Sequence, residues 1–246
     1  MPSKQPSTSV QYNSFKTAAA QLLNFPIFEN EISVESVARY FGGRIGYKPD
    51  KKTSGRIERC IADACRLATP KGTYTIVPVT TVNPGKSMCL YNGLQLTVPE
   101  CFNDLGTRFV AISIGTLGEE LESQCRSLAK SGEIYQSTLF DSVGTTMLDL
   151  LSEKISDAIA KSYKNDGLLK GERFSPGLDG YPLEQQRSLF NLADSESIGV
   201  SLNSSNIMIP SKSVSFFLVL TKTRKNLTKN KCNSCRMGNC QFRLMV

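Results

Sequence analysis

The chain of 246 residues contains no histidine. Histidine is the commonest general base in enzymes and the usual nitrogen ligand of zinc. Its absence excludes every Ser-His-Asp or Cys-His catalytic arrangement within this chain. We therefore expect the protein to position another molecule for reaction, rather than to transfer protons with its own side chains.

Long apolar runs are also missing. None approaches the roughly 18 residues that a membrane-spanning helix needs. The longest, Val214 to Leu220 with Ser215 inside it, is typical of a buried strand. Residues 1–12 are polar and lack the hydrophobic stretch of a secretory signal. We therefore expect a cytoplasmic protein without membrane association.

The signatures of nucleic-acid binding are largely absent, although the formal net charge is +7. A cysteine–histidine finger is impossible, and no basic, aromatic-rich strand resembles an RNA-recognition motif. Much of the positive charge is local, and attraction to an acidic protein partner explains it equally well. The basic residues gather in an early loop and in the C-terminal tail: Lys48, Lys51, Lys52, Lys222, Arg224, Lys225, Lys229, Lys231, Arg236 and Arg243.

Apolar periodicity predicts both helices and strands. Helices are expected over residues 14–23, 33–41, 54–68, 139–163 and 183–192, with a further one after Gly118. Strands are expected over residues 74–82, 94–98, 108–114 and 198–202 and within 207–220, with Pro78 indicating an edge or a bulge. The elements mix without a strict βαβ rhythm and without an internal repeat. This mixture predicts an α+β fold with an antiparallel sheet.

The stretch from Arg173 to Pro182, RFSPGLDGYP, joins a fixed positive charge to a stiff loop. Its two prolines fix φ, and its two glycines can take the positive φ values closed to other residues. A loop that is shaped before a ligand arrives loses little entropy on binding. The planar guanidinium of Arg173 suits two-pronged recognition of a carboxylate. The alternative interpretation is a structural turn with a surface arginine.

Further segments with a distinctive order are Ala38–Gly43 (ARYFGG), Val110–Gly118 (VAISIGTLG), Asp141–Gly144 (DSVG), Ile198–Leu202 (IGVSL) and Met208–Val214 (MIPSKSV). Together with the loop, they resemble the activation (reactivation) domain of cobalamin-dependent methionine synthase, and most of all its free-standing bacterial relatives. The resemblance implies a curved α+β domain with a twisted antiparallel sheet flanked by helices. We expect it over residues 29–223, between an N-terminal tail with a short helix (1–28) and a basic, Cys-rich tail (224–246).

The resemblance also implies a function, namely an S-adenosylmethionine-binding activation factor that supports reductive methylation of cobalamin. The cobalamin would be held by a partner, either a methionine synthase lacking its own activation domain or another corrinoid protein. In the family, flavodoxin or a similar donor such as ferredoxin reduces the inert cobalt, and S-adenosylmethionine then methylates it. Arg173 would pair with the methionine carboxylate. The residues that would shape the loop around the ligand are Pro176, Gly177, Tyr181 and Pro182.

The loop departs from the family pattern at one place. The synthase reads Gly-Tyr-Pro, whereas here Leu178 to Gly180 stand between Gly177 and Tyr181. The free-standing relatives usually carry an aromatic residue where this chain has Leu178. A second hypothesis is therefore a non-catalytic adaptor of the same fold that has lost the ligand and docks an acidic partner. Whether the protein is an enzyme component stays open.

The tail carries a second constellation, Cys232, Cys235 and Cys240. Two cysteines three positions apart can clamp one metal ion, and the third can complete most of a zinc or iron–sulfur set. A fourth ligand would come from another cysteine or from outside the chain. A third hypothesis is accordingly a metal accessory protein for corrinoid reduction. The alternative is a flexible tail with redox-sensitive cysteines.

Overall fold

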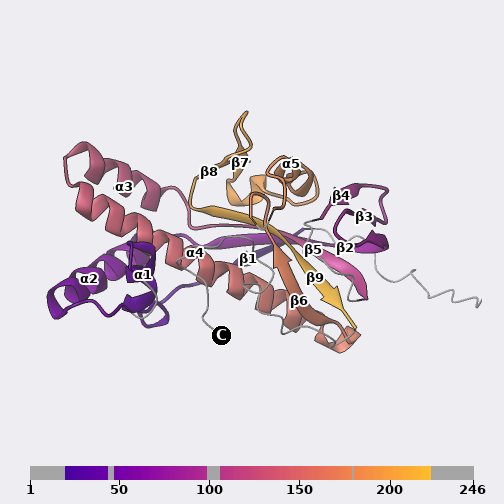
Figure 1. The fold of residues 1–246 in the computed structure, drawn as a ribbon, viewed down its shortest axis with the longest axis horizontal. Coiled ribbons are helices and arrows are strands. Elements are labelled where there is room, and N and C mark those ends of the chain that lie inside the picture. The colour runs from indigo at the N-terminus through magenta and orange to yellow at the C-terminus, as the bar shows by residue number, and fades with distance from the viewer. Residues whose placement is uncertain (1–19, 44–46, 99–105, 179, 223–246) are drawn as a thin grey trace, which may run out of the picture.

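A seven-stranded antiparallel sheet runs through the molecule, and a long helix crosses one of its faces (Figure 1). The structure, a computed structural model, describes residues 20–43, 47–98, 106–178 and 180–222. The strand order is β4-β3-β2-β5-β9-β6, with β1 paired to β2. The strands are β1 (Gln21–Asn24), β2 (Lys71–Asn83), β3 (Ser87–Leu90), β4 (Gln95–Thr97), β5 (Thr107–Thr116), β6 (Leu169–Phe174) and β9 (Ser213–Thr221), with a separate pair β7 (Ser201–Leu202) and β8 (Met208–Ile209).

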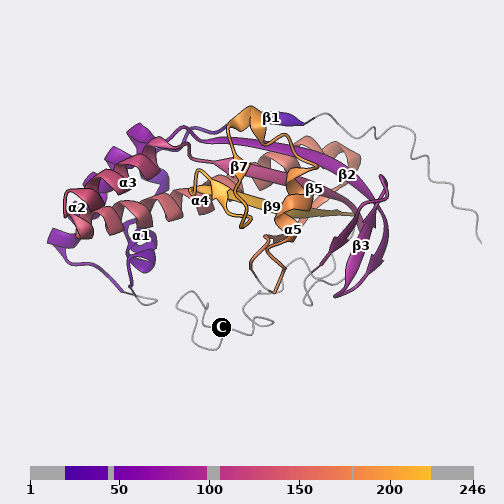
Figure 2. The same ribbon diagram turned by 90° about the horizontal axis from the view of Figure 1, so that it is seen from above.

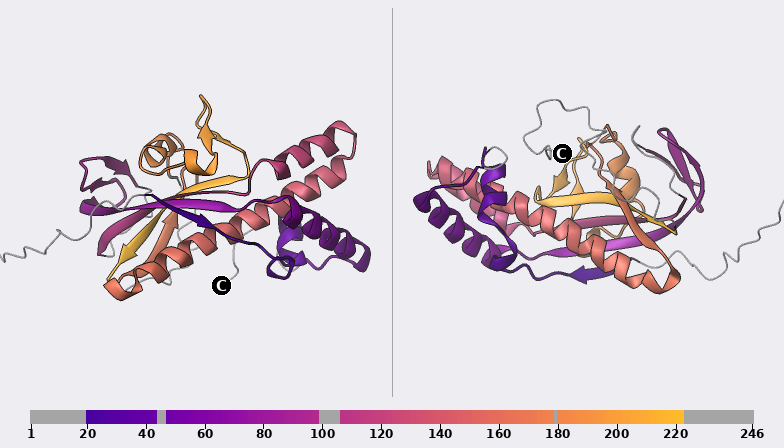
Figure 3. Two further views of the ribbon diagram at one scale, coloured as in Figure 1. Left: turned by 180° about the vertical axis from the view of Figure 1, so that it is seen from behind. Right: turned by 60° about the horizontal axis from the view of Figure 1, so that its bottom comes forward.

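Helices lie on both faces of this sheet (Figure 3). They are α1 (Val34–Tyr40), α2 (Lys51–Leu67), α3 (Glu120–Lys130), α4 (Ile134–Ser162) and α5 (Gln185–Phe190), with the 3-10 turns η2 (Glu29–Glu31), η3 (Lys164–Asp166) and η4 (Glu196–Ile198). Seen from above, α1 to α3 form one end of a curved body, and β3 bends away at the other end (Figure 2). This arrangement confirms the expected α+β fold with an antiparallel sheet flanked by helices. Among the described residues, no helix has the length and apolar character needed to cross a bilayer.

Each face of the sheet has its own core because side chains alternate along every strand. On β9, Phe216 and Leu218 turn toward α4, whereas Phe217 and Val219 turn toward α5 and η4. All of them are buried. The continuous apolar run of this strand therefore follows from burial on both faces.

Helix α4 approaches the sheet closely at two glycines that are paired neighbours, Gly72 on β2 and Gly115 on β5. A Cβ atom added to Gly115 would lie 2.7 Å from Cδ1 of Ile155, and one added to Gly72 would lie 2.8 Å from the same atom. Real Cβ contacts are essentially never this short, so a larger residue must displace Ile155 or the helix.

We expect Gly115→Val to destabilise the protein by about 2–3 kcal/mol, because it overpacks this contact. Urea unfolding followed by circular dichroism measures the change. The matched control is Gly55→Ala in α2, where an added Cβ meets nothing within 4 Å, so helix propensity predicts a gain of about 0.5–1 kcal/mol. In an Ile155→Ala background the valine should cost much less. An equal cost in both backgrounds would contradict this packing account.

At the sheet edges, one expectation was wrong and one strand was missed. Residues 21–24 belong to strand β1, not to the end of a helix, and residues 14–19 lie outside the described part of the chain. The strand forms because the backbone groups of Gln21 to Asn24 pair with those of Lys71 to Tyr74. This pairing outweighs the local helix propensity. The sheet therefore includes residues before the expected domain start at 29. Strand β6 was not anticipated at all.

Candidate functional site

Arg173 lies on β6, the strand at one edge of the sheet, directly before the loop. It is paired in register with Leu218 of β9, and Phe174 is paired with Phe217. Because consecutive strand residues face opposite sides, Arg173 turns toward α4 and Phe174 toward α5. The arginine is thus carried by a strand, and its position does not depend on the loop alone.

The guanidinium of Arg173 is held from several sides. Its Nη1 lies 3.1 Å from Oε1 of Glu153 on α4 and donates to Oγ of Ser156 at 3.5 Å. Its central carbon lies 5.3 Å from the centre of the Phe216 ring, a distance at which a cation is attracted to the ring face. The side chain keeps 25% of its surface exposed. Arg173 is therefore pre-oriented but reachable from solvent.

Arg173 opens on a cavity of about 440 Å³ between the η2–α1 segment, α4 and β6. The cavity contains charges of both signs close together. Its lining residues are Glu31, Ser33, Ser36, Arg39, Tyr40, Thr146, Asp149, Leu150, Glu153 and Arg173. A volume in this range is typical of small-molecule sites, and the polar, charged lining suits a charged ligand.

The cavity's acidic groups are fixed by hydrogen bonds. Tyr40 donates its hydroxyl to Oδ2 of Asp149. Burial, and next the hydrogen bond to Asp149, raise the pKa of Tyr40 above its ordinary value, so the phenol stays protonated and remains a donor. Glu31 pairs with Lys154 at 2.6 Å, and this hydrogen bond lowers the pKa of the Glu31 carboxyl. The Glu31 carboxylate is therefore ionised near neutral pH.

The loop after β6 closes on itself through backbone hydrogen bonds. The N–H of Gly177 donates to the carbonyl of Tyr181 at 2.8 Å, and the N–H of Tyr181 donates to the carbonyl of Leu178 at 2.8 Å. Gly177 has φ of 84°, which explains the glycine at that position. The Tyr181 ring is buried 5.6 Å from the ring centre of Phe217. Tyr181 thus anchors the loop in the core on the α5 side.

The sequence-predicted site residues are therefore separated by the sheet. Arg173 faces the α4 side, whereas Tyr181 packs on the opposite face. Pro176 is buried, and Gly177 and Pro182 are exposed.

The sequence patterns did not point to the cavity partners Arg39, Tyr40, Asp149 and Glu153. Asp149 and Glu153 did carry a signal, since a four-residue spacing places two carboxylates on one face of a predicted helix.

Comparison with known proteins bears on the fold. A solved structure of the MetH reactivation domain bound to AdoHcy is similar to this chain, with a TM-score of 0.59 and 15% sequence identity. The match covers 82% of this chain and 78% of that one. The chain shares the fold of the MetH reactivation domain. No family model matches the sequence, and no curated protein matches it either.

Within this MetH-like fold, the Tyr181 hydroxyl is buried and has no hydrogen-bond partner among the described residues. We expect Tyr181→Phe to keep the ring packing and raise the free energy of unfolding by about 1 kcal/mol, because a buried unsatisfied hydroxyl is removed. Urea denaturation measures this, with Tyr91→Phe at an exposed position as the control. A clear loss of stability in Tyr181→Phe would mean that the hydroxyl is bonded after all.

The candidate metal ligands Cys232, Cys235 and Cys240 lie outside the described residues. Within the described ranges, no group of three or more histidine, cysteine, aspartate or glutamate side chains could hold a metal ion. Zinc or iron–sulfur binding by the tail stays a prediction from the sequence.

Proposed function

We propose that the protein is an S-adenosylmethionine-binding activation factor that supports reductive methylation of cobalamin held by a separate protein. The observation that carries the proposal is the cavity at Arg173, where a pre-oriented guanidinium stands beside fixed carboxylates. The fold shared with a MetH reactivation domain supports it.

An amino-acid head group matches this cavity in charge and shape. Its carboxylate would pair with Arg173, in two-pronged geometry, with Arg39 adding a second positive charge. Its ammonium would pair with Asp149 or Glu153. The existing ion pair between Arg173 and Glu153 would open on binding. The ligand's carboxylate would take the place of Glu153 at Arg173, and the ligand's ammonium would pair with Glu153. Neither charge is left buried without a partner.

The loop would act mainly through its shape. Tyr181 anchors it in the core on the α5 side, and Pro176 is buried. Exposed Gly177 and Pro182 belong to the loop that follows β6, and we propose that they contact the part of the ligand outside the cavity. In this proposal the side chain of Tyr181 positions the loop and does not touch the ligand.

Methyl transfer from a sulfonium to reduced cobalt needs no general acid or base, so proximity supplies the acceleration. This agrees with a chain that has no histidine. The cobalamin would arrive on a methionine synthase without its own activation domain, or on another corrinoid protein. Flavodoxin or ferredoxin would supply the electron, and the protein itself would bind and aim the methyl donor.

Calorimetric titration of the purified protein tests the proposal. We expect saturable binding of both S-adenosylmethionine and S-adenosylhomocysteine, which carry the same head group. Adenosine, which lacks it, should bind at least about tenfold more weakly, because the charged contacts supply most of the affinity. A flat titration of folded protein with all three would favour the adaptor hypothesis.

A further inference from the structure

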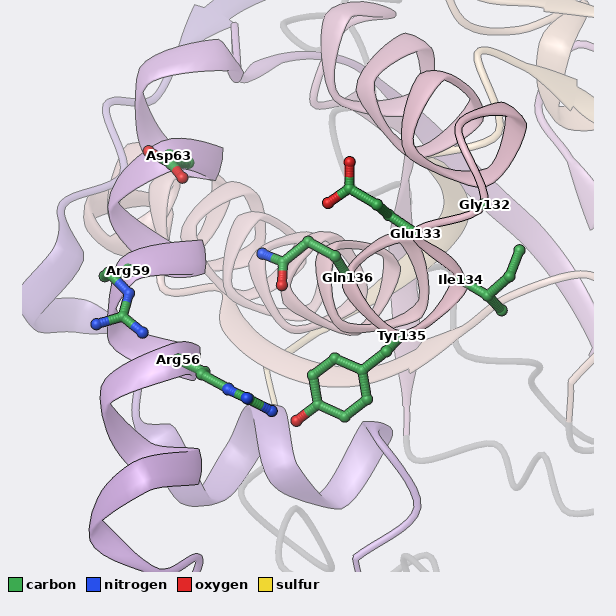
Figure 4. A pocket seen from close by; sticks show the side chains of 8 residues that line it. All are labelled: Arg56, Arg59, Asp63, Gly132, Glu133, Ile134, Tyr135 and Gln136. Atoms are coloured by element: carbon green, nitrogen blue, oxygen red, sulfur yellow. The ribbon is translucent and has the colours of Figure 1, made fainter.

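A second cavity of about 560 Å³ lies at the helical end of the molecule, between α2 and the turn that joins α3 to α4 (Figure 4). It shares no lining residue with the cavity at Arg173. Arg56 and Arg59 project from α2 on one side, with Tyr135 beside Arg56 and with Glu133 and Gln136 across the opening. The function proposed above does not use this site.

The two arginines are placed to act together. They are three residues apart on α2, and this spacing puts them on one face of the helix, one turn apart. The central carbon of Arg56 lies 5.4 Å from the centre of the Tyr135 ring. That ring is itself held edge-on by Phe41, with the ring centres 5.1 Å apart. Arg56 is therefore stacked in a fixed orientation, as guanidinium groups often are where they bind anions.

Within the described residues, neither Arg56 nor Arg59 has a carboxylate partner, although two carboxylates line the same cavity. Asp63 pairs instead with Arg66, one turn further along α2. Glu133 accepts a hydrogen bond from the Ser131 hydroxyl at 3.3 Å. The arginine side of the cavity is thus left available to a negatively charged ligand.

We propose that this cavity binds the phosphate group of a small phosphorylated molecule. Two guanidinium groups on adjacent turns can share the three oxygens of a phosphate dianion. A carboxylate, by contrast, would pair with only one of the two guanidinium groups. The cavity is larger than a phosphate, so the remainder of the molecule has room beside Tyr135 and Gln136. Glu133 repels the anion from across the opening and limits its affinity.

Titration calorimetry at constant ionic strength tests the proposal with three probes, namely inorganic phosphate, pyrophosphate and ribose 5-phosphate. We expect saturable binding of at least one probe. Its affinity should fall by about tenfold or more in the double variant Arg56→Ala/Arg59→Ala and by about threefold or more in Arg59→Lys, because lysine cannot bind in two-pronged fashion. Glu133→Gln should tighten binding by about two- to fivefold, since it removes a like charge.

Lys161→Ala is the control. It removes one positive charge, as Arg59→Ala does, but from the far end of α4, and should leave the affinity within about twofold. Arg59→Ala alone keeps the stacked Arg56–Tyr135 pair intact. This single variant therefore still tests the proposal if the double variant does not fold. Three results would each overturn the proposal. They are no saturable binding of any of the three probes, an affinity that is unchanged in both Arg59→Ala and the double variant, and a loss of affinity in Lys161→Ala as large as that in Arg59→Ala. Binding of S-adenosylmethionine should be unaffected by these variants, which separates this site from the cavity at Arg173.

Discussion

Replacing Arg173 by alanine should raise the Kd for S-adenosylmethionine by about 100-fold, which corresponds to about 2.7 kcal/mol. The substitution removes the group that would bind the methionine carboxylate and leaves that carboxylate facing Asp149 and Glu153. Stability should change little, because the Glu153 side chain is 54% exposed and can be solvated by water. Calorimetric titration of the variant against the unaltered protein gives the ratio directly.

Two further variants separate specific recognition from general charge. Arg173→Lys keeps the charge but loses the planar fork, so an intermediate loss of about tenfold is expected. Arg187→Ala removes an exposed arginine of α5, whose Nη2 donates to the Ser204 carbonyl, and should leave the affinity within about twofold. If Arg187→Ala weakened binding as much as Arg173→Ala does, a non-specific electrostatic attraction would explain the affinity better.

Phe217→Ala should have the largest effect on stability, a loss of about 3–5 kcal/mol. Phe217 is fully buried in the middle of β9. Its ring lies 5.2 Å from that of Phe174 and 5.6 Å from that of Tyr181. It therefore joins the end of β6 to the end of the loop, and its removal leaves a cavity between them. Urea unfolding measures the loss, and ligand affinity should fall as well, because Arg173 neighbours Phe174.

Tyr91→Ala is the matched control for this change. Tyr91 is also aromatic but 66% exposed, and its truncation should cost no more than about 0.5 kcal/mol. A loss below about 1 kcal/mol in Phe217→Ala would show that the two ends of the loop are held by something else.

The elements that the sequence predicted well are those that carry their own burial signal. Helix α4 repeats apolar residues at helical spacing, and β5 and β9 are continuous apolar runs because they are covered on both faces. The start of α1 was also local, since the Ser33 side chain accepts from the Ser36 N–H as an N-cap. Such features can be recognised before any tertiary contact is known.

The edge strands lacked such a signal. β1 forms because it pairs with β2, and β6 forms because it pairs with β9. β6 has a glycine and three charged residues within the six residues LKGERF, which is a poor strand pattern. As a result, Arg173 and Tyr181 were expected to act together around one ligand. The alternation of side chains along an unrecognised strand put the two on opposite faces.

The cavity at Arg173 could be predicted only in part for a similar reason. It joins residues more than a hundred positions apart, for example Tyr40 and Asp149, and only the packing of α1 on α4 brings them together. Local patterns can nominate a guanidinium or a carboxylate, but the distance between them depends on the whole fold.

The most direct test is a crystal structure of the protein with S-adenosylhomocysteine. We expect the ligand's carboxylate to lie about 3 Å from the terminal nitrogens of Arg173, with its ammonium beside Asp149 or Glu153. A bound ligand whose head group lies elsewhere, with the pair between Arg173 and Glu153 unchanged, would contradict it.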